Sequence, residues 1–87
     1  MDVAEVTSKV KQIISNVTNI APSQIADDAS FVEDLNLDSL SLLEIGVDVD
    51  FEFKLGVPEE RLQQLRTVQD SVDLVLQVLA EKTAAAS

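Results

Sequence analysis

The chain has 87 residues, of which 46% are hydrophobic, so it can form one small domain around its own core. It contains no cysteine and no histidine, which excludes disulfides, a thiolate nucleophile and a Ser-His-Asp triad within the chain. Its formal net charge of −10 repels phosphate backbones and anionic lipids, and it either attracts basic protein surfaces or serves solubility alone. We therefore expect a binding protein, not an enzyme, with no nucleic-acid partner and no membrane insertion.

The start of the chain bears on localisation and on the first helix. Met1-Asp-Val-Ala has neither the basic residues nor the apolar run of a signal peptide, which favours a cytoplasmic protein. Asp2 can cap a helix that ends by Thr18, and Glu5 completes a capping-box pattern. The apolar face of this helix is formed by Val3, Val6, Val10, Ile13, Ile14 and Val17.

Residues 19–37 form a long connection that is rich in turn-forming residues. A loop of this length is uncommon in a compact domain unless it is functional or held down by its own side chains. Apolar residues are spaced along it and can anchor it to the core: Ile20, Ile25, Phe31, Leu35 and Leu37. We expect a pinned loop.

A second helix and a short third helix follow this connection. Asp38 is a good N-cap for the second helix, and Ser39 lies in its first turn. This helix should run to about Leu55, with Gly56 as the left-handed residue after its end. Pro58 favours the start of the third helix, because proline fits the first helical turn.

A last helix is predicted from Thr67-Val-Gln-Asp70, which resembles another cap. Its apolar face is formed by Val68, Val72, Val75 and Leu79. We expect residues 83–87 to form a flexible tail, which leaves residues 1–82 as the folded domain. The pattern predicts an all-α fold: a small four-helix bundle with three long helices, one short helix and a long first loop.

Alternating oxygen-bearing side chains in residues 34–38 suggest a calcium-binding EF-hand loop. Such a loop needs glycine at its sixth position and a bidentate glutamate at its twelfth. Here those positions are Ser39 and Ile45, and Glu44 is one residue short. We therefore predict no metal site in this stretch.

The second helix carries two apolar stripes, about 160° apart on a helical wheel. One stripe should face the core and consists of Leu42, Ile45, Val49 and Phe53. The other is flanked by acidic side chains and consists of Leu40, Leu43, Val47 and Phe51. An apolar strip with a charged rim is typical of a protein-docking face. The alternatives are a helix buried on both sides and a Phe51 folded under a loop.

Asp38-Ser39-Leu40, preceded by Asp34-Leu and Leu37 and followed by Glu44-Ile45, resembles the attachment site of acyl carrier proteins. The resemblance keeps its order and spacing from the first helix to about Leu79. It includes Asp28-Ala-Ser30-Phe31, Phe53-Lys54, Val57-Pro58 and Arg66-Thr67-Val68.

This resemblance implies that Ser39 Oγ carries 4′-phosphopantetheine, donated by coenzyme A and attached by a separate phosphopantetheinyl transferase. The arm's thiol would hold acyl groups as thioesters for fatty-acid, polyketide or related lipid biosynthesis. Asp38 would contact the transferase or its metal. Synthases and acyl-transferring enzymes with basic patches would dock on Leu40, Leu43, Glu44, Val47, Asp50 and Phe51. The acyl cavity would be lined by Phe31, Leu42, Ile45, Gly46, Val49, Phe53, Val68, Val72, Val75 and Leu79.

Three positions depart from the usual pattern of the family. Gly46 stands where members often carry a larger apolar residue. Widening of the cavity, close approach of a neighbouring helix and simple drift are the open explanations for this glycine. Phe51 replaces a common carboxylate, and Asp48 replaces a small apolar residue. The more aromatic docking face favours a dedicated polyketide or modified-lipid pathway over housekeeping fatty-acid synthesis.

Two other functions stay open. A peptidyl or aminoacyl carrier shares the fold and the serine, although the negative charge and the Asp-Ser-Leu context favour acyl cargo. A small acidic helical protein for interaction or calcium binding would carry no prosthetic group, and Ser39 would then be only a helix-end serine. In each case we expect a monomer.

Overall fold

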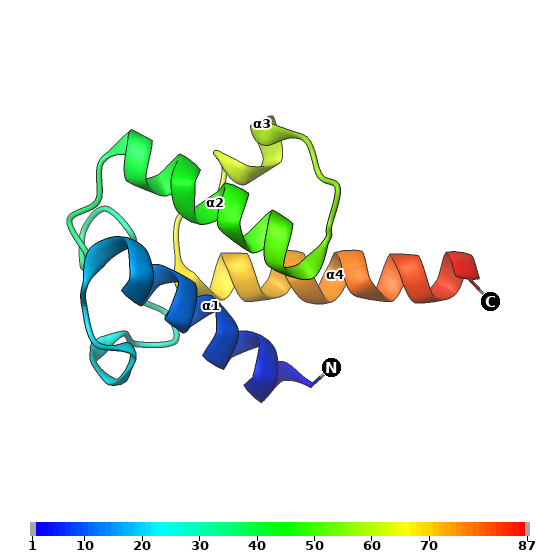
Figure 1. Ribbon diagram of the computed structural model, residues 1–87, viewed down its shortest axis with the longest axis horizontal. Coiled ribbons are helices and arrows are strands. Elements are labelled where there is room, and N and C mark those ends of the chain that lie inside the picture. The colour runs from blue at the N-terminus through cyan, green and yellow to red at the C-terminus, as the bar shows by residue number, and fades with distance from the viewer. Residues whose placement is uncertain (1, 87) are drawn as a thin grey trace.

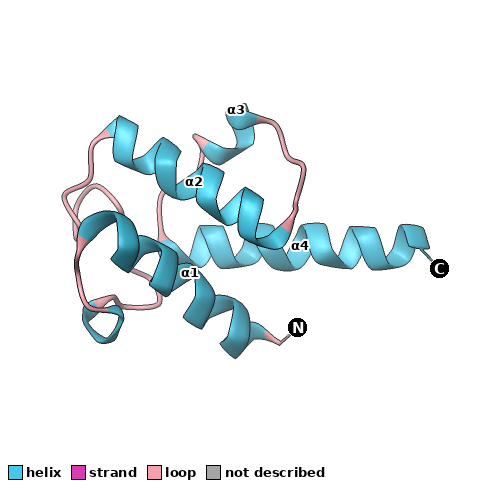
Figure 2. Ribbon diagram, in the orientation of Figure 1, coloured by secondary structure: helices cyan, strands magenta, loops and turns pink. Residues whose placement is uncertain are grey.

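The structure is a computed structural model that describes the backbone of residues 2–86 and the side chains of residues 2–81. The described chain forms four α-helices: α1 (Val3–Thr18), α2 (Ser39–Phe53), α3 (Glu59–Leu62) and α4 (Val68–Ala86). A short 3-10 turn, η1 (Pro22–Gln24), lies in the long first connection (Figure 2). The predicted all-α bundle with one short helix is confirmed.

The three long helices pack around a common core, and α3 packs on α2. In Figure 1, α2 and α4 run in the same general direction and α1 runs the opposite way. The centre of the core is formed by Val6, Val10, Ile14, Ile45, Val49, Val68, Val72 and Val75. Removing an aliphatic side chain of this size from water stabilises the fold by about 1.5–3 kcal/mol. Val3, predicted on the buried face of α1, is exposed at the start of the helix.

The N-cap and the end of α1 follow the prediction. The Asp2 carboxylate accepts a hydrogen bond from the Glu5 backbone N–H at 2.8 Å, which satisfies one of the free donors of the first turn. Asn19 takes a left-handed conformation with φ of 65°, and its N–H donates to the Ser15 carbonyl at 2.7 Å. The helix therefore ends at Thr18, as its sequence predicts.

The predicted end of α2 is wrong by two residues. The helix stops at Phe53, and Lys54 takes the left-handed conformation with φ of 52°. The Leu55 N–H donates to the Asp50 carbonyl at 3.0 Å, and the Lys54 N–H donates to the Phe51 carbonyl at 3.3 Å, which together form a Schellman motif. This early end turns Leu55 into the core, where it is buried. Gly56 also has a left-handed backbone, with φ of 69°, as predicted, although Lys54 is the residue that ends the helix.

The short α3 starts one residue later than predicted, with Pro58 as its N-cap. In α4, Thr67 Oγ1 accepts a hydrogen bond from the Asp70 N–H at 3.0 Å, and Asp70 Oδ2 accepts one from the Thr67 N–H at 3.2 Å. This reciprocal pair is the capping box that the sequence indicates.

At its other end α4 continues to Ala86, so the predicted boundary at residue 82 is not where the helix ends. The segment contains Ala84, Ala85 and Ala86, and alanine has the highest helix propensity. Residue 87 lies outside the described residues, and flexibility of the tail stays a prediction.

The long first connection is pinned, as expected. Ile25 and Phe31 are buried in the core, and Ile20, Leu35 and Leu37 pack against it. The connection also bonds to the start of α4: the Phe31 N–H donates to the Arg66 carbonyl at 2.9 Å, and the Val68 N–H donates to the Ala29 carbonyl at 3.0 Å. Within residues 2–86, no helix has the length and apolar character needed to cross a membrane.

Candidate functional site

Ser39 is the first residue of α2, and its side chain is exposed. The preceding Asp38 caps the helix: its Oδ1 accepts a hydrogen bond from the Ser41 backbone N–H at 2.8 Å. That N–H, together with the Ser41 hydroxyl, holds the pKa of the Asp38 carboxyl below its usual value. The site therefore presents a serine hydroxyl at the positive end of a capped helix, where backbone N–H groups favour a phosphate.

A hollow of about 450 Å³ lies beside Ser39. Its lining is formed by Ser39, Leu40, Leu42, Leu43 and Gln63. Leu42 also packs against the core, so it lies between this hollow and the interior of the bundle. Gln63, which follows α3, was not predicted at the site, because only the packing of α3 on α2 brings it there. A group attached to Ser39 Oγ would therefore have room in this hollow, next to leucine side chains and Gln63.

The second stripe of α2 is exposed to solvent except at Leu43, which is partly buried, so the helix is not buried on both sides. Leu40 is 73% exposed, Val47 is 48% exposed and Phe51 is 83% exposed. A hollow of about 340 Å³ on this face is lined by Leu40, Leu43, Glu44, Val47 and Asp48. Phe51 does not fold under a loop.

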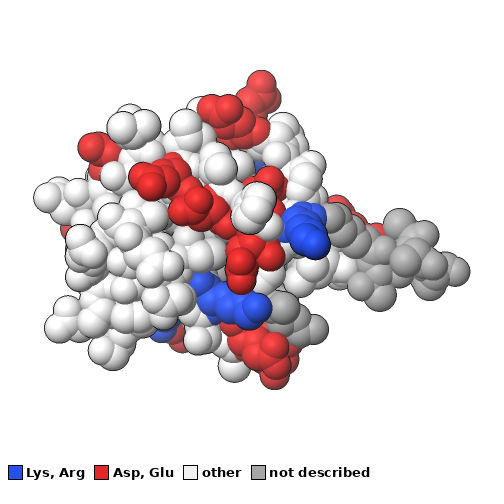
Figure 3. All heavy atoms as spheres, viewed as in Figure 1, with Lys and Arg blue, Asp and Glu red and all other residues white. Residues whose placement is uncertain are grey.

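Acidic side chains follow this exposed stripe. Glu44, Asp48 and Glu52 are four residues apart and all exposed, so they form one ridge along α2. Figure 3 shows acidic side chains crossing the visible face along the line of this helix. Glu52, which was not among the predicted docking residues, also forms an ion pair with Lys9 of α1 at 3.8 Å. An apolar strip beside an acidic ridge suits a partner with a complementary basic surface.

Asp50 differs from the other predicted docking residues. It is only partly exposed, and its Oδ1 accepts a hydrogen bond from the Val57 backbone N–H at 3.1 Å. This bond ties the end of α2 to the start of the α3 segment. The Asp50 carboxylate therefore has a structural partner within the chain, which the sequence pattern did not indicate.

The ten predicted cavity residues lie together in the core. Leu42 and Leu79 are partly buried, and the remaining members are buried: Phe31, Ile45, Gly46, Val49, Phe53, Val68, Val72 and Val75. A Cβ added to Gly46 would lie 2.9 Å from Leu62 Cβ, closer than such atoms normally approach. The glycine therefore allows α3 to approach α2, which is one of the explanations that the sequence left open.

The oxygen-rich stretch before α2 is used for local structure. Asp34 Oδ2 accepts a hydrogen bond from the Ser30 N–H at 2.7 Å, and Asn36 has a left-handed backbone with φ of 57°. Across the part of the chain that the structure describes, no group of three acidic, histidine or cysteine side chains could hold a metal ion. The Asp34 carboxylate thus closes a turn in the loop, and the Asp38 carboxylate caps α2.

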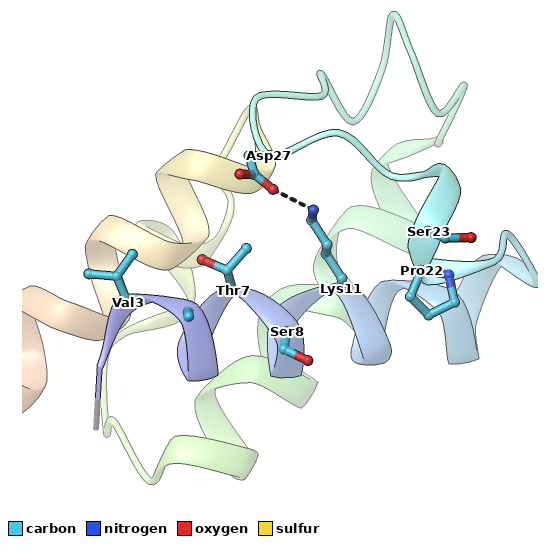
Figure 4. Close-up of a pocket in the computed structure, with 8 residues that line it drawn as sticks. Val3, Thr7, Ser8, Lys11, Pro22, Ser23 and Asp27 are labelled. Atoms are coloured by element: carbon cyan, nitrogen blue, oxygen red, sulfur yellow. Dashed lines mark hydrogen bonds and ion pairs between the residues drawn. The ribbon is translucent and has the colours of Figure 1, made fainter.

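A larger hollow, of about 650 Å³, lies between α1 and residues 22–27. Figure 4 shows Lys11 and Asp27 pointing toward one another there, and the two side chains form an ion pair. Its lining shares no residue with the hollow beside Ser39. This second hollow is therefore separate from the candidate site.

A family model described as "Phosphopantetheine attachment site" matches residues 8–75, which include Ser39 and most of the bundle. The chain belongs to the acyl carrier protein family. An acyl carrier protein of Rhodococcus erythropolis is 43% identical over 77 residues, covering 88% of this chain and 85% of the relative. One from Thermosynechococcus vestitus is 37% identical over 75 residues, covering 86% of this chain and 93% of the relative.

A meromycolate extension acyl carrier protein of Mycobacterium leprae is 40% identical over 82 residues, covering 94% of this chain and 71% of the relative. The fold is also similar to the solution structure of an apo doublet acyl carrier protein from prodigiosin biosynthesis, with a TM-score of 0.77 and 27% identity. That match covers 88% of this carrier and 38% of the doublet. The family therefore accounts for the helical bundle, for its phosphopantetheine cofactor and for a carrier role in lipid biosynthesis.

Proposed function

We propose that Ser39 Oγ is the attachment point of 4′-phosphopantetheine and that this carrier presents acyl intermediates to the enzymes of a lipid-biosynthesis pathway. The observation that carries the proposal is the exposed Ser39 hydroxyl at the capped start of α2, inside the segment that matches the family. The meromycolate extension relatives support a lipid pathway.

The attachment is a phosphoryl-type transfer that a separate transferase catalyses. Ser39 Oγ attacks the phosphorus that bears the pantetheine part of coenzyme A. One phosphorus–oxygen bond forms to Oγ, the diphosphate bond breaks, and adenosine 3′,5′-bisphosphate leaves. The chain has no histidine or cysteine, so the transferase supplies the base that takes the serine proton. When bound, the arm supplies a terminal thiol that holds acyl groups as thioesters.

Asp38 and the hollow beside Ser39 have different parts in this proposal. Asp38 fixes the first turn of α2 through its bond to the Ser41 N–H, and its exposed carboxylate faces the transferase or its metal. The leucines and Gln63 of the hollow lie next to the arm. Leu42 marks the side on which an acyl chain enters the core.

The exposed stripe and acidic ridge of α2 form the docking face for partner enzymes. A short apolar strip with a charged rim favours fast, salt-sensitive association over tight binding, which suits a carrier that visits successive partners. The carrier itself catalyses no reaction: tethering raises the effective concentration of the cargo at each partner. A cytoplasmic monomer stays the prediction of the sequence.

The test is the intact mass of the chain before and after incubation with coenzyme A and a broad-specificity phosphopantetheinyl transferase. Ser39→Ala should gain no mass, whereas the native chain should gain one phosphopantetheine. Ser41→Ala is the matched control, because it removes a hydroxyl from the same helical turn and should still be loaded. Equal loading of Ser39→Ala and the native chain would overturn the assignment of Ser39.

A further inference from the structure

Ser71 places a hydroxyl group in the interior of the bundle. The residue has 0% of its surface exposed, and its Oγ has no hydrogen-bond partner among the described residues. Buried hydroxyl groups nearly always have a partner, because an unpaired one loses its bonds to water and gains nothing in return. The Ser71 Oγ is therefore available to a hydrogen-bonding group that enters the bundle.

The position of Ser71 on α4 places it among the predicted cavity residues. At 100° per residue, the buried arc of α4 extends from Val72 to Leu74, and Ser71 lies close to its middle. Val68 and Val75, three residues before and four residues after Ser71, lie on the same side of the helix and are fully buried. The neighbour one turn before Ser71 is Thr67, whose Oγ1 accepts a hydrogen bond from the Asp70 N–H, and the other side chains around Ser71 on this face are apolar.

Backbone bonds show that Ser71 lies at the same end of the bundle as Ser39. The Leu37 N–H donates to the Phe31 carbonyl at 2.9 Å, just before the cap of α2. The Phe31 N–H in turn donates to the Arg66 carbonyl at 2.9 Å, just before α4 begins. Ser71 lies one turn further, about 4.5 Å along the axis of α4 from Val68. A chain that enters the core from the Ser39 end reaches the level of Ser71 before that of Val75 and Val78.

We propose that Ser71 Oγ is a specificity-determining group that hydrogen-bonds an oxygen substituent near the thioester of the acyl cargo, as in a 3-hydroxyacyl or 3-oxoacyl chain. A serine hydroxyl can donate to a ketone and can donate to or accept from a hydroxyl, whereas a saturated chain offers neither bond. The carrier then shelters oxygenated intermediates better than saturated chains of the same length. This inference rests on the proposed function, because the cargo must be attached at Ser39.

The test compares 3-hydroxyoctanoyl and octanoyl cargo on the native carrier and on Ser71→Ala, with loading confirmed by intact mass. The rate at which hydroxylamine cleaves each thioester reports how well the chain is sheltered. Ser71→Ala should speed cleavage of the 3-hydroxyoctanoyl thioester by about fivefold, the equivalent of one net hydrogen bond. For the octanoyl thioester, Ser71→Ala should leave the cleavage rate unchanged or lower it. A saturated chain cannot bond to the Ser71 hydroxyl, so it packs at least as well against alanine.

Val75→Ala is the matched control on the same face of α4. It opens space without removing a hydroxyl, so it should change the cleavage of both cargoes by the same factor. If Ser71→Ala also changed both cargoes equally, Ser71 would be a small packing residue and the inference would be wrong. If no variant gained an arm at Ser39, the proposed function would fail, and this inference with it.

Discussion

The two apolar stripes of α2 are similar in composition and opposite in environment. Ile45 and Val49 on one stripe are almost completely buried, whereas Leu40 and Phe51 on the other are more than two-thirds exposed. Hydrophobicity therefore does not decide which face of this helix packs inward. The packing of the neighbouring helices decides it: α1 and α4 cover one face, α3 lies against Gly46, and the remaining face is exposed to solvent.

The largest difference between the stripes should be in stability. Ile45→Ala leaves a cavity in the core and should lower the free energy of unfolding by about 2–5 kcal/mol. Phe51→Ala removes an exposed ring and should change it by less than about 0.5 kcal/mol. Urea unfolding followed by circular dichroism measures both. A larger loss for Phe51→Ala than for Ile45→Ala would mean that the two stripes have been assigned the wrong way round.

The next largest effect on the free energy of unfolding should come from substitutions at Gly46, which lies between the two stripes. Gly46→Ala places a Cβ against Leu62 Cβ, so α3 must shift, and we expect a loss of about 1–3 kcal/mol from overpacking. Leu62→Gly in the same chain removes the opposing Cβ and should relieve part of that loss. A double-mutant cycle by urea unfolding measures the coupling. Additive effects of the two substitutions would contradict the close approach of α3.

For partner binding, we expect substitutions in the exposed stripe to have a larger effect than substitutions in the buried stripe. Phe51→Ala should lower the kcat/KM of a partner transferase by about tenfold, the loss of ~1.4 kcal/mol from an exposed aromatic anchor. Ile45→Val, a conservative change in the core, should leave this value almost unchanged. Initial rates of loading with saturating coenzyme A provide the comparison. Equal rates for Phe51→Ala and the native chain would remove Phe51 from the docking face used by that transferase.

The acidic ridge should contribute a smaller and salt-dependent effect. Glu44→Lys reverses a charge beside the apolar strip and should slow loading several-fold at low ionic strength, with the difference shrinking as salt is added. Glu60→Lys makes the same charge change on α3 and is the control. If Glu60→Lys slowed loading as much as Glu44→Lys, net charge and not the α2 ridge would steer the partner.

The smallest expected effect concerns the cap at the start of α2. Because the folded-state pKa of Asp38 is lowered, chiefly by the Ser41 N–H, the cap stabilises the fold fully above the ordinary pKa of 3.8. That contribution is lost as pH falls through the lowered folded-state pKa. Asp38→Asn keeps a good cap without a titrating group. The unfolding free energies of the two proteins should therefore converge as pH falls below 3.8, and a constant gap down to low pH would contradict this account.

Local signals in the sequence predicted the parts of the fold that local chemistry decides. The Asp2 and Thr67 caps and the start of α2 at Ser39 depend on side chains within three residues of each other. The end of α2 was missed because the burial of Leu55, a tertiary effect, selected Lys54 for the left-handed position. The candidate site residues divide in the same way, into those that local sequence patterns indicate and those that only tertiary contacts bring to the site.

Ser39, Leu40 and Phe51 could be found from helical periodicity and from the family resemblance. Gln63 could not, because only the packing of α3 against α2 brings it beside Ser39. The structural bond from Asp50 to the Val57 N–H and the orphaned Ser71 hydroxyl likewise depend on contacts that no sequence pattern encodes. The sequence thus predicts which residues form the candidate site, and the packed structure shows which side chains surround them.

The most direct test of the central claim is to locate the arm on the loaded chain by peptide fragmentation. The whole mass of one phosphopantetheine should lie on Ser39, at the first turn of α2, and the acidic ridge of Glu44, Asp48 and Glu52 should stay unmodified. An arm found on Ser41 or on any residue outside this turn would contradict the assignment of the site and of the docking face built around it.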